Sequence, residues 1–188
     1  MKNAIIIHGM PLKQMFYDET TASPSNYHWL PWLQKQLIIR EIDTQTPEMP
    51  RPFEPDYIQW SKMFERFEIT EDTLLIGHSG GAGFLCRWLS ENKNIRVGQV
   101  VLTAPWLDLQ RQRTGNFFDF SLDPDLVSRT KKVTVVYSDN DDEIILDSVR
   151  RIKNEIPCIH LKELHGLGHF SHWDMEKAEF PQLIEVLV

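Results

Sequence analysis

Short apolar segments alternate along the chain with stretches in which apolar and polar residues mix at helical spacing. The apolar segments are residues 4–7, 37–42, 73–76, 98–103, 132–137 and 157–161. Most of them are continuous apolar runs rather than strict alternations, as expected for strands that are covered on both faces of a sheet. The pattern therefore predicts about six buried strands.

The intervening stretches carry the spacing of helices. These predicted helices are residues 26–35, 56–67, 80–91 and 143–156, followed by a last short helix that begins at Pro181. Pro31 is expected in the first turn of the first helix or at a kink in it. Strands that alternate with helices form a mostly parallel sheet with helices on both faces. We therefore predict an α/β fold, a three-layer α/β/α sandwich, with a single domain over residues 1–188.

Composition and charge limit the classes of function that fit this chain. The chain is 41% hydrophobic and 25% charged, with a formal net charge of -7, which is typical of a globular protein. Acidic and basic residues are interspersed without a basic stripe, which argues against a nucleic-acid partner. The N-terminal apolar run is too short for a signal peptide or a membrane helix, and Cys86 and Cys158 have no metal or disulfide spacing. We expect a cytoplasmic protein without a membrane partner, and nothing in the sequence indicates a protein partner.

A candidate nucleophile follows the third predicted strand. Gly77-His78-Ser79-Gly80-Gly81 is a full G-x-S-x-G motif, in which the serine occupies a strained strand-to-helix turn that only small neighbours fit. The glycines match neither a phosphate loop, which needs Gly-Lys followed by Ser or Thr, nor the G-x-G-x-x-G dinucleotide fingerprint. Taken alone, the motif also fits an ordinary tight turn between a strand and a helix.

Acidic residues follow the fifth predicted strand. Of these we choose Asp141 over Asp139 as the acid that orients a histidine, because it lies far enough beyond the strand for the loop to turn back. Asp108, after the fourth strand, is a reserve candidate.

Three histidines follow the sixth predicted strand, at His165, His169 and His172. No carboxylate or cysteine joins them at ligand spacing, so we expect no metal and no other cofactor. A histidine between glycine and phenylalanine on a loop at a strand end fits a general base, and we therefore select His169.

The order Ser79, Asp141, His169 is the order in which α/β-hydrolases carry their catalytic triad. Here the chain resembles the small serine hydrolases of the retinoblastoma-binding protein 9 and YdeN family. The resemblance covers nearly the whole chain and is carried by IIIHGM at 5–10, GHSGG, LTAPW at 102–106, the acidic loop and GHF at 168–170. It implies a compact α/β-hydrolase fold. One departure is that the family usually has prolines where this chain has Asp142 and Ile145.

The expected chemistry is acyl transfer to Ser79, with His169 as general base and Asp141 orienting its imidazole. The N–H groups of Met10 and Gly80 are predicted to form the oxyanion hole. Such a carboxylesterase-like enzyme would act on a small-molecule acyl substrate, an ester, thioester or amide.

The substrate pocket is predicted from apolar residues that follow the first and fourth strands, namely Leu12, Trp106, Phe117, Phe118 and Phe120. An apolar lining favours acyl or aromatic groups, whereas the alternative is that these aromatics belong to the core. A second interpretation of the whole chain is a protein-binding module that keeps the fold with little or no catalytic activity.

Overall fold

A six-stranded sheet in the order β2-β1-β3-β4-β5-β6 runs through the computed structural model, which describes residues 2–187. Every pair of neighbouring strands is parallel. The strands are β1 Asn3–Ile7, β2 Asp43–Gln45, β3 Leu74–His78, β4 Val97–Thr103, β5 Thr130–Ser138 and β6 His160–Leu164. The prediction of a mostly parallel sheet of about six strands is confirmed.

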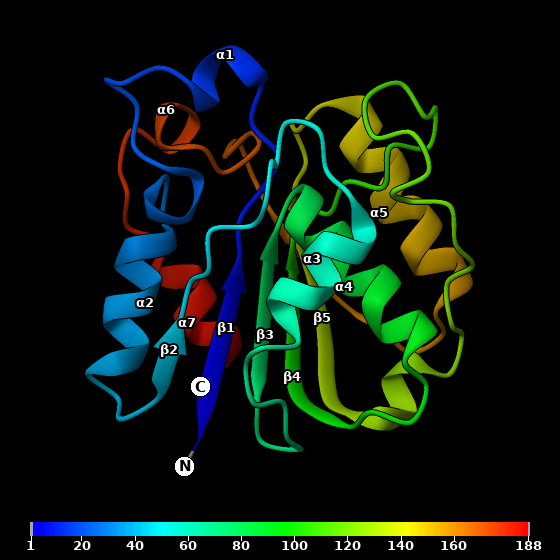
Figure 1. Cartoon of the computed structure of the whole chain (residues 1–188). Helices are drawn as coiled ribbons and strands as arrows, with labels where there is room; N and C mark the ends of the chain where they lie inside the picture. The colour runs from blue at the N-terminus through cyan, green and yellow to red at the C-terminus, as the bar shows by residue number, and fades with distance from the viewer. Residues whose placement is uncertain (1, 188) are drawn as a thin grey trace.

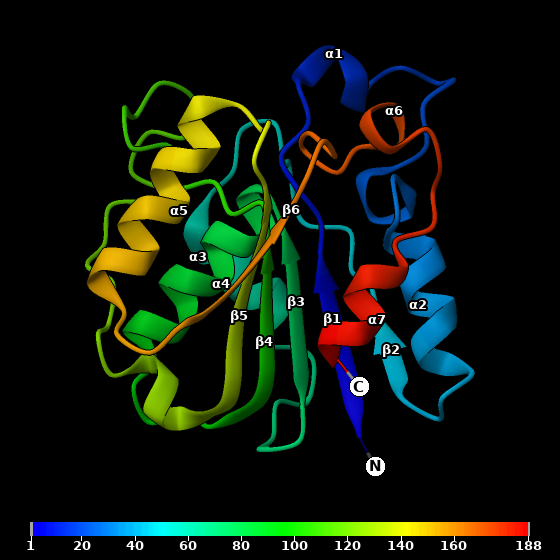
Figure 2. The same ribbon diagram turned by 180° about the vertical axis from the view of Figure 1, so that it is seen from behind.

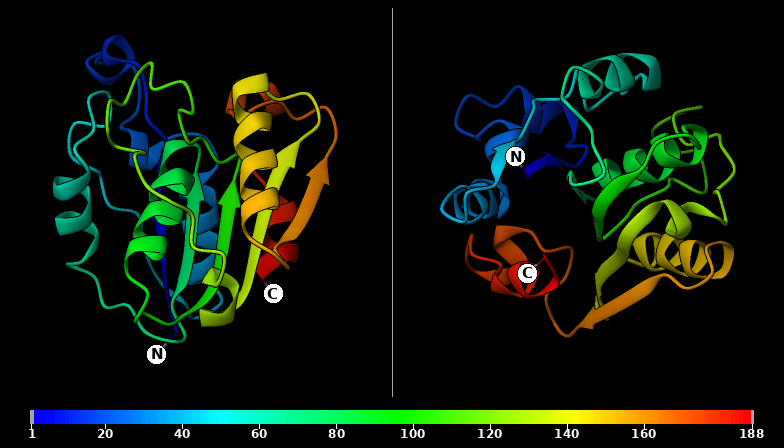
Figure 3. Two further views of the ribbon diagram at one scale, coloured as in Figure 1. Left: turned by 90° about the vertical axis from the view of Figure 1, so that its right-hand side faces the viewer. Right: turned by 90° about the horizontal axis from the view of Figure 1, so that it is seen from below.

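Helices cover both faces of the sheet and give three layers (Figure 1, Figure 2). On one face lie α2 Leu30–Ile38 and α7 Pro181–Leu187, and on the other lie α3 Tyr57–Phe64, α4 Gly80–Glu91 and α5 Glu143–Glu155 (Figure 3). Two short helices, α1 Lys13–Phe16 and α6 His172–Met175, lie beyond the carboxyl ends of the strands, at the top of Figure 1. They border the edge of the sheet at which the candidate residues gather.

The prediction of a strand over residues 37–42 is wrong. Helix α2 continues to Ile38, and β2 begins only at Asp43. Leu30, Leu33 and Leu37 are buried on one side of α2, because spacings of three and four residues share a helix face. The apolar run is therefore the end of an amphipathic helix and the turn after it.

Other boundaries also differ from the prediction, among them the start of α2 and the extent of β6. The segment 26–35 becomes helical only at Leu30, because Pro24–Asn26 forms a separate 3₁₀ turn, and Pro31 lies in the first turn of α2. Strand β6 covers His160–Leu164 rather than 157–161. Within the described residues it is an edge strand that pairs with β5 alone, so its sequence shows less of the continuous apolar character that marks the central strands.

Aromatic side chains pack the helices and loops against one another on both faces of the sheet. On one face Trp60 packs edge-on against Phe117 at 5.2 Å between ring centroids, and Phe64 packs against Trp88 at 4.9 Å. Such edge-to-face pairs stabilise beyond simple burial. On the other face Phe170, which follows His169, is fully buried and stacks on Phe180 with a 4.8 Å separation. The loop that carries His169 is thereby anchored in the core.

Helix α4 begins in close contact with β1. A Cβ atom added to Gly81 would lie 2.4 Å from the carbonyl oxygens of both Ile7 and His8, and one added to Gly77 would lie 2.5 Å from the Cα of Ala82. Glycine at position 81 therefore allows α4 to pass close to the end of β1, and glycine at position 77 allows the end of β3 to pass close to the first turn of α4.

This contact can be tested with a pair of glycine substitutions. Gly81→Ala meets backbone atoms, so we expect it to lower the free energy of unfolding by about 3 kcal/mol. Gly115→Ala serves as the control, because Gly115 has a φ of 56° but no atom within 4 Å of an added Cβ, and it should cost only about 1 kcal/mol. Urea denaturation measures both losses, and equal losses would contradict the close approach.

Candidate active site

Ser79 lies on the sharp turn between β3 and α4, with φ 54° and ψ -122°. Residues other than glycine rarely adopt this conformation, and it persists only where neighbours impose it. The Ser79 N–H donates to the Thr103 carbonyl at 2.9 Å, and the Ser79 carbonyl accepts from the N–H groups of Gly83 and Trp106 at 3.1 Å each. Backbone contacts thus hold the hydroxyl at the carboxyl edge of the sheet.

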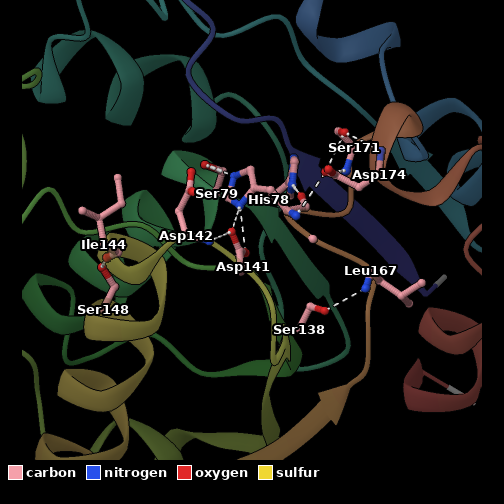
Figure 4. A network of polar contacts seen from close by, with 12 residues as sticks. His78, Ser79, Ser138, Asp141, Asp142, Ile144, Ser148, Leu167, Ser171 and Asp174 are labelled. Carbon is pink, nitrogen blue, oxygen red and sulfur yellow. Dashed lines mark hydrogen bonds and ion pairs between the residues drawn. The ribbon is translucent and has the colours of Figure 1, made fainter.

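A continuous hydrogen-bonded chain joins Ser79, His169 and Asp141. The His169 Nε2 lies 2.9 Å from the Ser79 Oγ, and its Nδ1 lies 3.1 and 3.0 Å from the two carboxylate oxygens of Asp141. Ser79 and Asp141 are labelled in Figure 4. The Asp141 side chain is 1% exposed and that of His169 is 32% exposed. The structure therefore brings together the three residues selected from the sequence, in an arrangement that can withdraw the proton of the serine hydroxyl.

The loops after β5 and β6 are joined by side chains that bind backbone N–H groups. The Ser138 Oγ accepts from the Leu167 N–H, drawn in Figure 4, and the Asn140 Oδ1 accepts from the Gly168 N–H, both at 2.9 Å. These bonds align the acidic loop with the histidine loop and leave the next acid, Asp141, opposite His169.

The alternative acid Asp139 has different partners. Its carboxylate accepts from the Gly166 N–H at 2.9 Å and lies 2.8 Å from the His165 Nδ1. The pKa of Asp139 is lowered, first by the hydrogen bond from the Gly166 N–H and second by the hydrogen bond with His165. The Asp139 carboxylate in turn raises the pKa of His165. This exposed pair shapes the loop and has no contact with Ser79.

The reserve acid Asp108 organises its own loop. It accepts hydrogen bonds from the N–H groups of Gln112, Arg113 and Thr114 at 3.1, 2.9 and 2.8 Å. Burial acts to raise its pKa, but the hydrogen bonds outweigh burial and hold the pKa below the ordinary value. Asp108 makes no contact with His169.

Asp142 stands where the family usually has a proline, and this difference does not displace the neighbouring Asp141 from His169. The Asp142 N–H donates to the Asp141 Oδ1 at 2.7 Å. A proline at this position would have no N–H to give, so this chain holds its carboxylate with one donor that the usual family sequence lacks.

The peptide groups around His169 are bound on both sides. The His78 Nε2 donates to the His169 carbonyl at 3.0 Å, and the Asp174 carboxylate accepts from the His169 N–H at 3.1 Å. Asp174 also forms a capping box with Ser171 at the start of α6 (Figure 4). The sequence alone indicates no role for His78 or Asp174, although His78 lies inside the G-x-S-x-G motif and Asp174 lies five residues after His169.

The two predicted oxyanion donors are neighbours. Met10 lies against Gly80, since a Cβ on Gly80 would meet the Met10 Cγ and Sδ at 2.7 Å. Within residues 2–187 neither the Met10 N–H nor the Gly80 N–H donates to another protein atom. Gly80 begins α4, whose positive dipole end favours negative charge. Two N–H groups beside Ser79 are therefore available to an oxyanion.

His8 shapes the loop that carries Met10. Its Nδ1 donates to the Gly9 carbonyl at 2.7 Å, and its Nε2 accepts from the Met49 N–H at 2.9 Å. Burial lowers the pKa of His8, so the ring is neutral and both nitrogens are occupied in shaping the backbone.

A cavity of about 110 Å³ opens beside Ser79 and His169. Its other walls come mainly from the segment between β1 and α2, including Met10, Phe16 and Tyr27. Of the residues predicted to line a pocket, Leu12 is exposed, while Phe117 and Phe118 are buried and pack against one another. Trp106 lines a separate hollow, and Phe120 packs against the core. The structure places all five outside this cavity.

Two further histidines, His28 and His78, border the cavity. The pKa of His28 is lowered to about 4, mainly by burial and further by repulsion from His172 and His169. Burial, followed by repulsion from His169, holds the pKa of His78 well below its usual range. Both rings are neutral near pH 7.

Within residues 2–187 there is neither a metal-binding cluster nor a helix that could span a membrane. Residues 2–187 contain no cluster of three or more His, Cys, Asp or Glu placed to hold a metal ion. No helix within them has the length and apolar character needed to cross a bilayer.

An all-parallel sheet with a serine on the turn after its third strand and a histidine after its last defines an α/β-hydrolase fold. The family profile described as Serine hydrolase matches residues 20–187, and the chain belongs to that family. The chain is a hydrolase, and the resemblance inferred from its motifs is confirmed.

Three comparisons illustrate this relationship. The YdeN protein of Bacillus subtilis (strain 168), named as a hydrolase, is 27% identical over 182 residues, which cover 93% of this chain and 94% of that protein. The crystal structure of the B. subtilis ydeN gene product matches with a TM-score of 0.81 at 24% identity, over 100% of this chain and 97% of that one. Est1E from Butyrivibrio proteoclasticus, solved with ferulic acid, matches with a TM-score of 0.63 at 14% identity, over 100% and 90%.

The two candidate acids can be separated by matched substitutions. Asp141→Asn removes the charge beside the His169 Nδ1, and we expect kcat for a p-nitrophenyl ester to fall by about 10³–10⁴-fold. Asp139→Asn changes a similar carboxylate two residues away and should lower kcat by less than about 10-fold, because its contact is with His165. Steady-state kinetics of both variants decides, and a larger loss in Asp139→Asn would contradict the assignment.

Proposed function

We propose that this protein cleaves a small ester, thioester or amide through an acyl-enzyme formed on Ser79. The observation that carries the proposal is the unbroken chain from the Ser79 Oγ through His169 to Asp141, with bonds of 2.9 to 3.1 Å. Ser79 lies at the N-terminal end of α4, and a cavity opens beside Ser79 and His169.

In the first half of the reaction, the Ser79 Oγ attacks the substrate carbonyl carbon while its proton passes to the His169 Nε2. Asp141 keeps the His169 Nδ1 protonated and stabilises the imidazolium that forms. The carbonyl oxygen becomes an oxyanion, which the N–H groups of Met10 and Gly80 would receive. The imidazolium then gives its proton to the leaving group, and the acyl group remains on Ser79.

In the second half, a water molecule takes the place of the leaving group. It transfers one proton to the His169 Nε2 and attacks the acyl carbon, which again passes through an oxyanion. His169 returns the proton to the Ser79 Oγ, and the carboxylic acid leaves. All proton transfers use the same imidazole, whose side chain reaches solvent at 32% exposure.

The proposal is tested by removing the nucleophile. Ser79→Ala should lower kcat for p-nitrophenyl butyrate by about 10⁶-fold if the three residues act as a unit. Ser128→Ala, an exposed serine of a distant 3₁₀ turn, is the control and should keep full activity.

Labelling with a fluorophosphonate gives a second measurement that does not depend on the choice of substrate. The wild type and Ser128→Ala should be labelled, and Ser79→Ala should not. A folded wild type that neither reacts with the probe nor hydrolyses esters would overturn the proposal and favour the binding-module interpretation.

A further inference from the structure

The cavity beside Ser79 has a wall without charged side chains. Among residues 2–187, none of those lining it is an aspartate, glutamate, lysine or arginine. Apolar groups such as Pro11, Met15, Phe16 and Leu30 supply much of its surface. The neutral state of His28 and His78 near pH 7 adds no charge to this lining.

The size of the cavity limits what fits inside. Its volume of about 110 Å³ is smaller than the roughly 150 Å³ apolar cavity that accepts benzene. A short alkyl chain or a single small ring fills such a space, and the rest of a longer chain would extend beyond its open side.

Resting on the acyl-enzyme chemistry above, we propose that this cavity binds an uncharged, apolar group of the substrate, no larger than about a benzene ring. The group belongs either to the acyl part or to the alcohol part of an ester. A charged group at this place would lose its hydration without gaining a partner. The net charge of -7 further disfavours anionic substrates.

Two substrate series distinguish the acyl part from the alcohol part. One series varies the acyl chain of methyl esters from acetate to decanoate, and the other varies the alcohol of acetates from methyl to decyl. In the series whose varied part enters the cavity, kcat/KM should rise by about 2–4-fold per methylene up to roughly six carbons and then stop rising. The other series should stay nearly flat.

A matched pair of variants links this effect to the cavity. Ala22 lines the cavity and is exposed, so Ala22→Trp narrows the space without disturbing the core. It should lower kcat/KM at least about 10-fold for the six-carbon member of the responding series and less than about 3-fold for methyl acetate. Gln14→Trp places the same ring on an exposed α1 residue that is not part of the lining and should change neither value.

The effect of charge is tested with monomethyl adipate and methyl hexanoate, of which only the first carries a terminal carboxylate. If the alcohol series is the one that responds, the test uses two acetates whose alcohol parts differ in the same way. We expect the charged ester to have at least about 100-fold lower kcat/KM. Equal rates, or an Ala22→Trp variant that leaves the long substrates unaffected, overturn the assignment of the cavity. If Ser79 is still labelled by the fluorophosphonate in that case, the proposed chemistry stands. Loss of labelling in the wild type defeats both.

A separate observation concerns His78. Its side chain is buried, with a relative exposure of 3%, and its Nε2 lies 3.0 Å from the carbonyl oxygen of His169. A carbonyl only accepts, so the His78 Nε2 carries the proton. His78 is also the residue directly before Ser79, next to it in Figure 4. We infer that His78 is a positioning residue, which ties the histidine loop to the strand that presents the serine.

This role predicts a loss in turnover rather than in substrate binding, because misplacing a catalytic group by about 1 Å can cost about 10²-fold in rate. His78→Leu removes the donor and should lower kcat by about 10–100-fold with KM within about 3-fold. His78→Gln, whose amide nitrogen can reach the same carbonyl, should restore kcat to within about 3-fold of the wild type.

The pH dependence of kcat separates positioning from general stability. His78→Leu leaves the His169 carbonyl without this donor and lets the histidine loop move relative to Ser79 and Asp141, so the pH profile should change, while His78→Gln should restore the profile. If His78→Leu does not fold, His78→Asn takes its place, because its shorter amide falls short of the carbonyl. A folded donor-free variant with wild-type kcat and profile overturns the role, as does a glutamine variant no better than the asparagine or leucine one.

Discussion

The close approach of α4 to the end of β1 is the constraint on which the candidate site depends. Gly81 has no room for a Cβ because the carbonyl oxygens of Ile7 and His8 would lie 2.4 Å away. This approach puts the loop that carries Met10 against Gly80, so that the two predicted oxyanion donors become neighbours. The strained backbone of Ser79 follows from the same packing, because the chain must reverse between β3 and α4 within one residue. Each glycine of the motif is thus explained by a neighbour of its own: the backbone of α4 for Gly77, the Met10 side chain for Gly80 and the end of β1 for Gly81.

The other half of the site extends the pairing of β5 with β6. The Ser138–Leu164 pair ends the ladder, and the Asp139 N–H still donates to the Leu164 carbonyl at 3.0 Å. From there side chains replace backbone pairing, as the loop after β5 binds the N–H groups of the loop after β6. The position of Asp141 opposite His169 is therefore set by strand register. Such a site is rigid because each loop is held by the sheet and by the other loop.

The sequence predicted the layers, most strands and the three residues in the hydrogen-bonded chain, because continuous apolar runs and the G-x-S-x-G motif reflect strong local constraints. It failed at residues 37–42, where the apolar pattern of a helix end resembles a strand. It also placed the pocket at Leu12, Trp106, Phe117, Phe118 and Phe120, whereas none of these lines the cavity, whose walls come mainly from other residues between β1 and α2. The contacts of His78 and Asp174 with His169 were invisible, because they join residues whose proximity depends on the folded loops.

The seven histidines of the chain differ in what surrounds them, and this decides which can act as a base. Burial lowers the pKa of His8, His28 and His78, and rings of this kind do not readily take up a proton. His165 has a carboxylate partner in Asp139 but no serine beside it. His169 alone, among the described histidines, contacts both a carboxylate and the Ser79 hydroxyl. A base must gain a proton at one nitrogen while the other stays bound, and only the environment of His169 provides for both.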